Sequence, residues 1–246
     1  MLVRQRFIFS SFLILFVCLS QRLLAQEKDL LSEYREKAMS WEKDIAAWEK
    51  SDQTEVADGS TLLFLGSSSI RRWQTLSTDI QPWKAIGRGY GGAKFSDLAI
   101  YAPRLLAAHH PKGVVVYVGN DITGKAETDK TPEEIVRLFG IVVDAIKKQV
   151  PQAEIFLIAI TPAPSRFEAW PKIQMANAQL QQFCKMDAKL HFIETHSAYL
   201  TPDGQPRPEL YVEDRLHQNE VGYKLWSGII RKELESVYGK PEPSSK

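Results

Sequence analysis

The residues best suited to chemistry in this sequence are a cluster of serines and an aspartate–histidine pair. Ser67, Ser68 and Ser69 directly follow the apolar run at 61–66, which reads as a buried strand that breaks at a glycine. A hydroxyl between a strand and a helix lies near free N–H groups and the positive end of the helix dipole, which favour developing negative charge. By itself, the cluster fits a serine-rich helix N-cap equally well.

Asp214 and His217 are three residues apart at the end of a long irregular segment, close enough to meet across one turn. A carboxylate in that position orients an imidazole and stabilises the imidazolium, as the acid of a serine triad does. Asn120 follows another apolar run and places a side-chain amide at the same expected sheet edge. A backbone N–H together with an asparagine amide makes a sufficient oxyanion hole. Alone, the Asp–His pair would equally suit a helix cap beside a surface histidine.

A glycine cluster predicts a tight turn, and its spacing also suggests dinucleotide binding as an alternative function. Gly87, Gly89 and Gly92 match the spacing of a dinucleotide-binding loop. That motif must follow the first strand of its unit and needs an acid about twenty residues later. Here the cluster follows the second expected strand, and the region around Lys112 has no acid. We therefore interpret the glycines as a tight turn that directs backbone N–H groups at an anion.

These residues must be positioned by alternating strands and helices. The hydrophobic pattern predicts five short strands separated by helices, which implies a parallel sheet with right-handed crossovers in a three-layer α/β/α sandwich. The strands are expected at 61–66, 84–88, 113–118, 153–160 and 190–194, and the main helices at 95–109, 131–149, 171–186 and 220–238.

The first 25 residues have the pattern of a secretory signal peptide. Arg4 and Arg6 precede an apolar run at 7–19, and a small residue, Ala25, ends the segment. The run is short for a membrane-spanning helix, so we expect export and cleavage near Ala25 rather than an uncleaved anchor, with no stable membrane insertion afterwards. Residues 26–60 are expected to form an N-terminal helix and a polar linker, residues 61–238 the catalytic domain, and residues 239–246 a disordered tail.

Composition excludes several classes of function. The chain has 246 residues and a formal net charge of +1, with no basic stripe, so nucleic acid is not an expected partner. Cleavage would leave Cys184 as the single cysteine, in a helical pattern that favours a buried structural thiol, and no metal-ligand spacing is present. The paired His109 and His110 are expected at an exposed helix end. The sequence carries no signal of oligomeric state.

Taken together, these blocks resemble the SGNH/GDSL hydrolase superfamily, and in particular its GSSSIRxW branch. The resemblance extends from about residue 26 to the last helix. It rests on four blocks that occur in the family's order: 64–70, 87–92, 119–121 and the Asp214–His217 pair, which is followed by Asn219, Gly222, Tyr223 and Trp226.

The resemblance implies a flavodoxin-like SGNH fold and a role for each block. Ser68 would be the nucleophile, His217 its base and Asp214 the orienting acid, with Ser68, Gly92 and Asn120 as oxyanion-hole donors. The chain departs from the family pattern in three places. Ser67 replaces the usual aspartate, Gly87 stands where asparagine is common, and the block around Asn120 is one residue shorter.

The implied activity is that of an exported serine esterase which needs neither metal nor organic cofactor. We expect it to hydrolyse short acyl esters, acetyl above all, on a glycan or another small molecule. The alternatives are a lysophospholipase or arylesterase and a non-catalytic carbohydrate-binding relative. Arg166, Trp170 and Tyr90 are the candidate substrate-binding residues. Because the mechanism needs a neutral histidine, activity should fall in acid.

Overall fold

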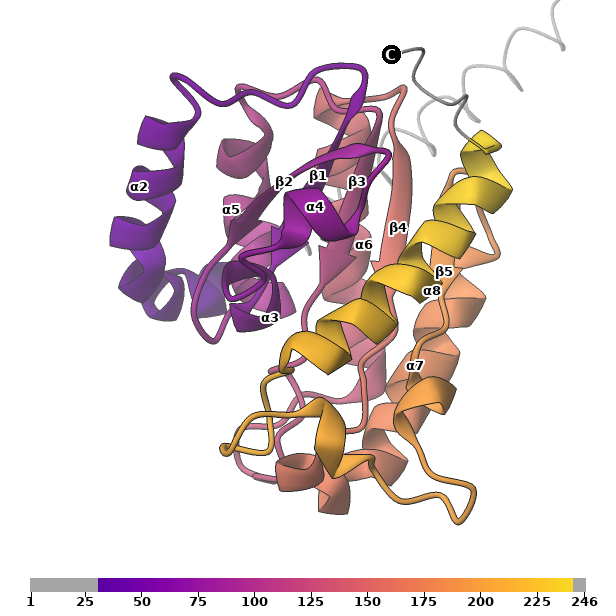
Figure 1. Cartoon of the computed structure of the whole chain (residues 1–246). Helices are drawn as coiled ribbons and strands as arrows, with labels where there is room; N and C mark the ends of the chain where they lie inside the picture. The colour runs from indigo at the N-terminus through magenta and orange to yellow at the C-terminus, as the bar shows by residue number, and fades with distance from the viewer. Residues whose placement is uncertain (1–30, 241–246) are drawn as a thin grey trace, which may run out of the picture.

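A computed structural model describes residues 31–240 and shows a parallel five-stranded sheet between two layers of helices (Figure 1). The signal peptide expected at 1–25 and residues 241–246 of the expected tail lie outside the described residues. The strands are β1 (Thr61–Gly66), β2 (Lys84–Gly89), β3 (Gly113–Tyr117), β4 (Glu154–Ile158) and β5 (Leu190–Ile193). Among residues 31–240, no helix is both long and apolar enough to span a membrane.

The strand order, β2-β1-β3-β4-β5, creates a crevice at one point of the sheet. From β1 the chain crosses to one side to form β2, and later returns to the other side of β1 to form β3. In open α/β sheets, ligands bind where the order reverses, outside the carboxyl ends of the two strands. The segments that follow β1 and β3 carry Ser68 and Asn120, so the topology brings these two residues to one edge.

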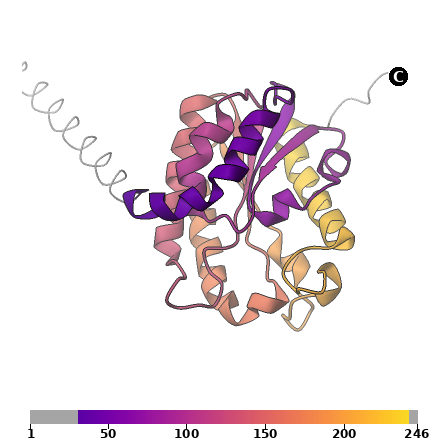
Figure 2. The same ribbon diagram turned by 90° about the vertical axis from the view of Figure 1, so that its left-hand side faces the viewer.

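The central strands contribute side chains to two separate cores, because successive side chains of a strand point to opposite faces of the sheet. Leu63 and Leu65 of β1 belong to one buried cluster, and Leu62 and Phe64 to the other. Figure 2 shows α8 on one side of the sheet and α5 on the other. The first core is covered by α2 (Glu42–Ser51), α5 (Phe95–Leu106), α6 (Pro132–Gln149) and α7 (Trp170–Cys184), and the second by α3 (Ser68–Arg71), α4 (Leu76–Asp79) and α8 (Glu220–Tyr238).

Local sequence signals set the ends of the best-predicted helices. Thr131 caps α6, because its side chain accepts a hydrogen bond from the Glu134 N–H at 3.2 Å. The side chain of Asn219 accepts one from the Gly222 N–H at 3.0 Å, so α8 begins at Glu220 as expected. Within the described residues, short 3-10 helices supplement these elements at η1 (Met39–Trp41), η2 (Pro164–Ala169), η3 (His196–Tyr199) and η4 (Pro208–Leu210).

The segment at 52–60, expected to be a polar linker, is tied into the fold. Asp52 is buried, and its carboxylate accepts a hydrogen bond from Arg88 Nε at 2.7 Å. Arg88 also pairs with Glu55 at 2.9 Å. His109 is likewise buried, with Nδ1 accepting from the Ala57 N–H at 3.0 Å, so its expected exposure was wrong. The opposite charges of Asp52 and Arg88 compensate each other's burial, a contact between segments that local patterns do not reveal.

The N-terminal helical segment packs over β2 and the turn that follows it. The indole N–H of Trp48 donates to the Gly89 carbonyl at 3.0 Å. The ring of Trp41 lies over Gly91, where a Cβ would come within 2.3 Å of it. The segment therefore covers the glycine turn that precedes Gly92.

Candidate active site

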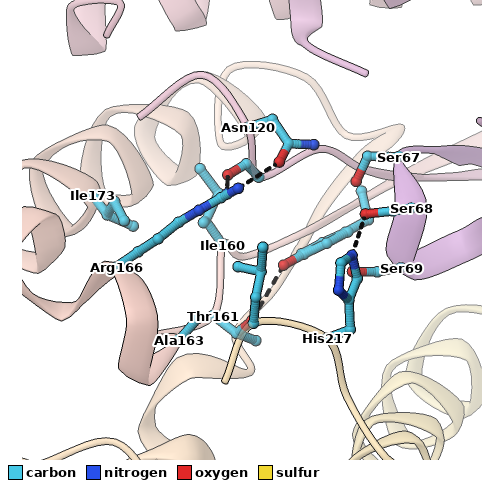
Figure 3. A pocket seen from close by; sticks show the side chains of 13 residues that line it. Ser67, Ser68, Ser69, Asn120, Ile160, Thr161, Ala163, Arg166, Ile173 and His217 are labelled. Atoms are coloured by element: carbon cyan, nitrogen blue, oxygen red, sulfur yellow. Dashed lines mark hydrogen bonds between the residues drawn. The ribbon is translucent and has the colours of Figure 1, made fainter. Parts of the chain in front are cut away.

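The three consecutive serines differ in accessibility, and this difference selects one of them. Ser67 and Ser69 are buried, whereas Ser68 is half-buried. The Ser67 N–H donates to the Tyr117 carbonyl at 3.1 Å, and the Tyr223 hydroxyl donates to the Ser69 carbonyl at 2.8 Å. Neighbouring chain segments thus hold the backbone on both sides of Ser68 while its hydroxyl faces the cleft (Figure 3).

A sharp turn after β1 places Ser68 at the start of α3. The turn needs a glycine at position 66, because a Cβ there would lie 2.1 Å from the Tyr117 carbonyl oxygen on the neighbouring strand. Gly89 has a similar role, since a Cβ would lie 2.4 Å from the Arg71 backbone nitrogen. The glycines of β2 therefore let α3 pack against the sheet, and the dinucleotide spacing is incidental.

Ser68, His217 and Asp214 form a continuous hydrogen-bonded chain. Ser68 Oγ lies 2.9 Å from His217 Nε2, and His217 Nδ1 lies 2.6 Å from Asp214 Oδ2. Asp214 Oδ1 also accepts the backbone N–H groups of Leu216 and His217, each at 2.9 Å. With Nδ1 bound to the carboxylate, Nε2 is left as the acceptor that a serine hydroxyl needs.

The carboxylate of Asp214 is held in its ionised form. Partial burial pulls the pKa of Asp214 upward, but the hydrogen bonds from His217 and from the Leu216 N–H outweigh it and lower the pKa to about 2. Arg72 Nη1 lies 3.7 Å from Asp214 Oδ2, and this half-exposed guanidinium adds a positive charge beside the carboxylate.

A compact loop turn, and not a helix, brings Asp214 and His217 together. The Val212 N–H donates to the His217 carbonyl at 2.9 Å, which closes the turn. Arg215 adopts a φ of 57° inside it, the left-handed conformation that a reversal this tight requires. Asn219 then caps α8, so the helix begins three residues after the histidine and fixes the turn at its end.

The amide of Asn120 is fixed at both ends. Arg166 donates from Nη1 to the Gly119 carbonyl at 2.7 Å and from Nη2 to Asn120 Oδ1 at 2.9 Å. Because a guanidinium has only donors, the amide oxygen must face Arg166 and the nitrogen must face away from it. Asn120 Nδ2 donates to the Ala93 carbonyl at 3.0 Å. In Figure 3 this nitrogen lies on the side of the serines, which leaves its second hydrogen for a ligand.

One cleft brings together the expected nucleophile, base and oxyanion donors. Ser68, Gly92, Asn120 and His217 all line it. Behind Ser68 the cleft narrows to a pocket of about 30 Å³, where a single water needs about 10–15 Å³. This pocket therefore admits a group of only a few heavy atoms. Apart from Arg166, its lining away from the nucleophile is uncharged and includes Tyr117, Gly119, Ile160, Thr161, Ala163 and Ile173.

Two of the three expected substrate-binding residues lie elsewhere. Arg166 lines the cleft, but Trp170 and Tyr90 are buried in the core and do not line it. Trp170 begins α7 and packs near the ring of His196, and Tyr90 packs against the ring of Trp41. An aromatic residue in a loop sequence suits stacking on a sugar or filling a core equally well, and here packing determined the outcome.

Sequence reasoning assigned no role to two arginines that line the cleft. Arg71 and Arg72 follow the serine cluster after one residue, Ile70, within the motif already singled out, so their position was a usable signal. Cys184 is buried as expected, and burial raises the pKa of its thiol to about 12. Within residues 31–240, no cluster of three or more potential ligands among His, Cys, Asp and Glu is suited to a metal ion.

The hydrogen-bonded Ser68, His217 and Asp214 lie at the sheet edge where open α/β folds bind their ligands. The model of the GDSL-like lipase/acylhydrolase family matches residues 56–225, more than half of the chain. The chain therefore belongs to the GDSL-like lipase/acylhydrolase family and is a carboxylic ester hydrolase. No curated protein matches its sequence.

Solved structures share the fold at low sequence identity. A GDSL-like lipase from Bacteroides thetaiotaomicron superposes with a TM-score of 0.67 at 19% identity, over 78% of this chain and 98% of that one. The acetyl xylan esterase AlAXEase gives 0.58 at 20% identity, over 70% and 98%. A carbohydrate esterase family 3 protein from Talaromyces cellulolyticus gives 0.58 at 14% identity, over 74% and 99%. These likenesses confirm the expected fold.

Proposed function

We propose that this protein is an exported serine esterase that removes short acyl groups, chiefly acetyl, from carbohydrate esters. The observation that carries the proposal is the series of hydrogen bonds from Ser68 through His217 to Asp214, at 2.9 and 2.6 Å. It lies beside a pocket that admits a group of only a few heavy atoms. Export rests on the signal-peptide pattern of residues 1–25.

In the proposed reaction, Ser68 Oγ attacks the ester carbonyl carbon while His217 Nε2 takes its proton. The negative charge that develops on the carbonyl oxygen is held by the N–H groups of Ser68 and Gly92 and by Asn120 Nδ2. When the tetrahedral intermediate collapses, His217 returns the proton to the leaving alcohol. Water then attacks the acyl-serine with His217 as base, releasing the carboxylic acid and regenerating the hydroxyl.

The size of the acyl pocket supports a short chain. A pocket of about 30 Å³ holds the methyl group of an acetyl ester, whereas a fatty acyl chain would have to lie along the open surface. Two of the solved structures that share the fold are an acetyl xylan esterase and a carbohydrate esterase. Acetylated sugars are therefore a better match than the lysophospholipids or aryl esters of the alternative activity.

The test is hydrolysis of p-nitrophenyl acetate by the purified wild type and by Ser68→Ala. We expect wild-type turnover and a loss of at least about 10³-fold in the variant. Ser77→Ala, an exposed serine outside the cleft, is the matched control and should keep full activity. An inert wild type, as expected of a non-catalytic relative, or a fully active Ser68→Ala variant would refute the mechanism.

A chain-length series on the same protein tests the substrate class. The specificity constant should fall steeply from acetyl to octanoyl esters if the small pocket holds the acyl group. A maximum at long chains would favour the lysophospholipase alternative.

A further inference from the structure

The mouth of the cleft, outside the nucleophile, carries an excess of positive charge. This mouth is an open depression of about 500 Å³ that continues from the acyl pocket toward solvent. Three arginines line it, Arg71, Arg72 and Arg166, and within residues 31–240 no acidic residue does.

Arg166 brings into the cleft a charge that, within residues 31–240, has no carboxylate at ion-pair distance. Its two Nη atoms donate to neutral oxygens of Gly119 and Asn120, and within residues 31–240 no ion pair includes it. Burial lowers the pKa of Arg166, although an arginine stays protonated in a protein. A cation removed from water without a partner is costly, and a bound anion would offset that cost.

Arg71 and Arg72 face the same space from α3 and the residue that follows it. Their side chains are 55% and 52% exposed, and their contacts with Asp44 at 3.3 Å and Asp214 at 3.7 Å are long and solvated. Exposed ion pairs of this kind contribute about 0–1 kcal/mol, so they do not commit either side chain to its present partner. Both guanidinium groups are available to a ligand.

We infer that the mouth of the cleft binds a carboxylate carried by the alcohol part of the substrate, so that the preferred substrates are acetyl esters of acidic sugars such as uronic acids. The planar donor fork of arginine matches a carboxylate in paired hydrogen bonds. The acyl pocket of about 30 Å³ has no room for a carboxylate beyond an acetyl group, so a negative charge fits only the leaving-group side. This inference rests on the proposed esterase function and extends it to the substrate class.

The experiment compares two matched esters, the methyl glycosides of monoacetylated glucuronic acid and monoacetylated glucose. At low salt we expect kcat/KM to be about tenfold higher for the uronate, the effect of one additional charged hydrogen bond. The preference should shrink as sodium chloride is raised, because salt screens exposed charges. In the double variant Arg71→Gln/Arg72→Gln, the ratio of kcat/KM for the uronate to kcat/KM for the glucose ester should fall to about 1–3.

Arg137→Gln is the matched control, because this exposed arginine of α6 lines neither part of the cleft, and its ratio should stay at the wild-type value. Circular dichroism checks that the double variant is folded, which is expected since both side chains are more than half exposed.

Three results would overturn the inference: equal values for the two sugars, a preference that survives in the double variant, or faster hydrolysis of a lysophosphatidyl ester than of the uronate. In each case turnover of the neutral acetyl sugar shows whether the proposed esterase function itself stands. Absence of turnover on every ester would refute both.

Discussion

Asn120 and Arg166 offer the sharpest test of how the site stabilises negative charge. Asn120 uses its oxygen to accept from Arg166 at 2.9 Å and one amide hydrogen to donate to Ala93 at 3.0 Å. One amide hydrogen remains for the oxyanion contact proposed above. Asn120→Ala should therefore lower kcat by about 10²–10³-fold, or about 2.7–4 kcal/mol of barrier.

Arg166→Met acts on the same donor indirectly. It removes the charged hydrogen bond, worth about 1.5–3 kcal/mol, that holds the amide oxygen away from the nucleophile. We expect kcat to fall by about 10–100-fold, less than in Asn120→Ala, because part of the population keeps the productive orientation. In an Asn120→Ala background nothing is left to orient, so adding Arg166→Met should change kcat by no more than about threefold.

The assay is a double-mutant cycle on p-nitrophenyl acetate, a neutral ester, with kcat and KM determined separately. Urea unfolding of each variant checks that the fold is retained. Arg207→Met is the control, since Arg207 also donates to a backbone carbonyl but lies outside the cleft. The reasoning fails if Asn120→Ala slows the reaction less than about tenfold, or if Arg166→Met causes the same loss in both backgrounds.

Three further predictions concern stability. Arg88→Met should lower the free energy of unfolding by about 3–5 kcal/mol in urea titrations, because Asp52 is left buried without its 2.7 Å partner; a loss below about 1 kcal/mol would show that the pair is dispensable. Gly66→Ala should destabilise the fold and reduce activity together, since its Cβ would lie 2.1 Å from the Tyr117 oxygen, and an unchanged melting temperature would contradict this. The pKa of Asp214 is about 2, below that of the unfolded chain, so its ionisation stabilises the fold above pH about 4, and this stability is lost as pH falls toward 2. Wild type should therefore lose more stability than Asp214→Asn over that range, and equal losses in urea midpoints would refute the assignment.

Much of the fold follows from patterns that are local in the chain. The apolar run at 61–66 and the helix at 220–238 occur where the sequence predicts them. Strand alternation, the cap residue Thr131 and the cap residue Asn219 act through neighbours only a few residues away. The order of strands and helices then leaves few topologies, and this is why the sandwich was predictable.

The candidate site was predictable in part because its residues fall at strand ends. Ser68, Gly92 and Asn120 each follow a strand, and parallel strands end at one edge of the sheet. The Asp214–His217 spacing is local and is visible directly in the sequence.

Tertiary packing decided what these local rules leave open. The resemblance singled out Ser68 by its register in the motif, and the structure adds the physical reason, because Ser67 and Ser69 are buried and the Ser68 hydroxyl meets a histidine 149 residues away. Arg166 contacts Asn120, which is 46 residues away in the chain. Arg71 and Arg72 gained a proposed role only because the structure shows that they line the cleft.

The same reason explains the errors. The burial of Trp170 and of His109 depended on partners distant in the chain. The sequence by itself predicted that Ser68, Gly92, Asn120 and the Asp214–His217 pair meet at one sheet edge, and it indicated the chemistry that these residue types suit. Only the tertiary structure decided how Ser68 meets His217, how the Asn120 amide is turned, and where positive charge faces open space. Those outcomes depend on long-range contacts and on burial, which no local pattern encodes.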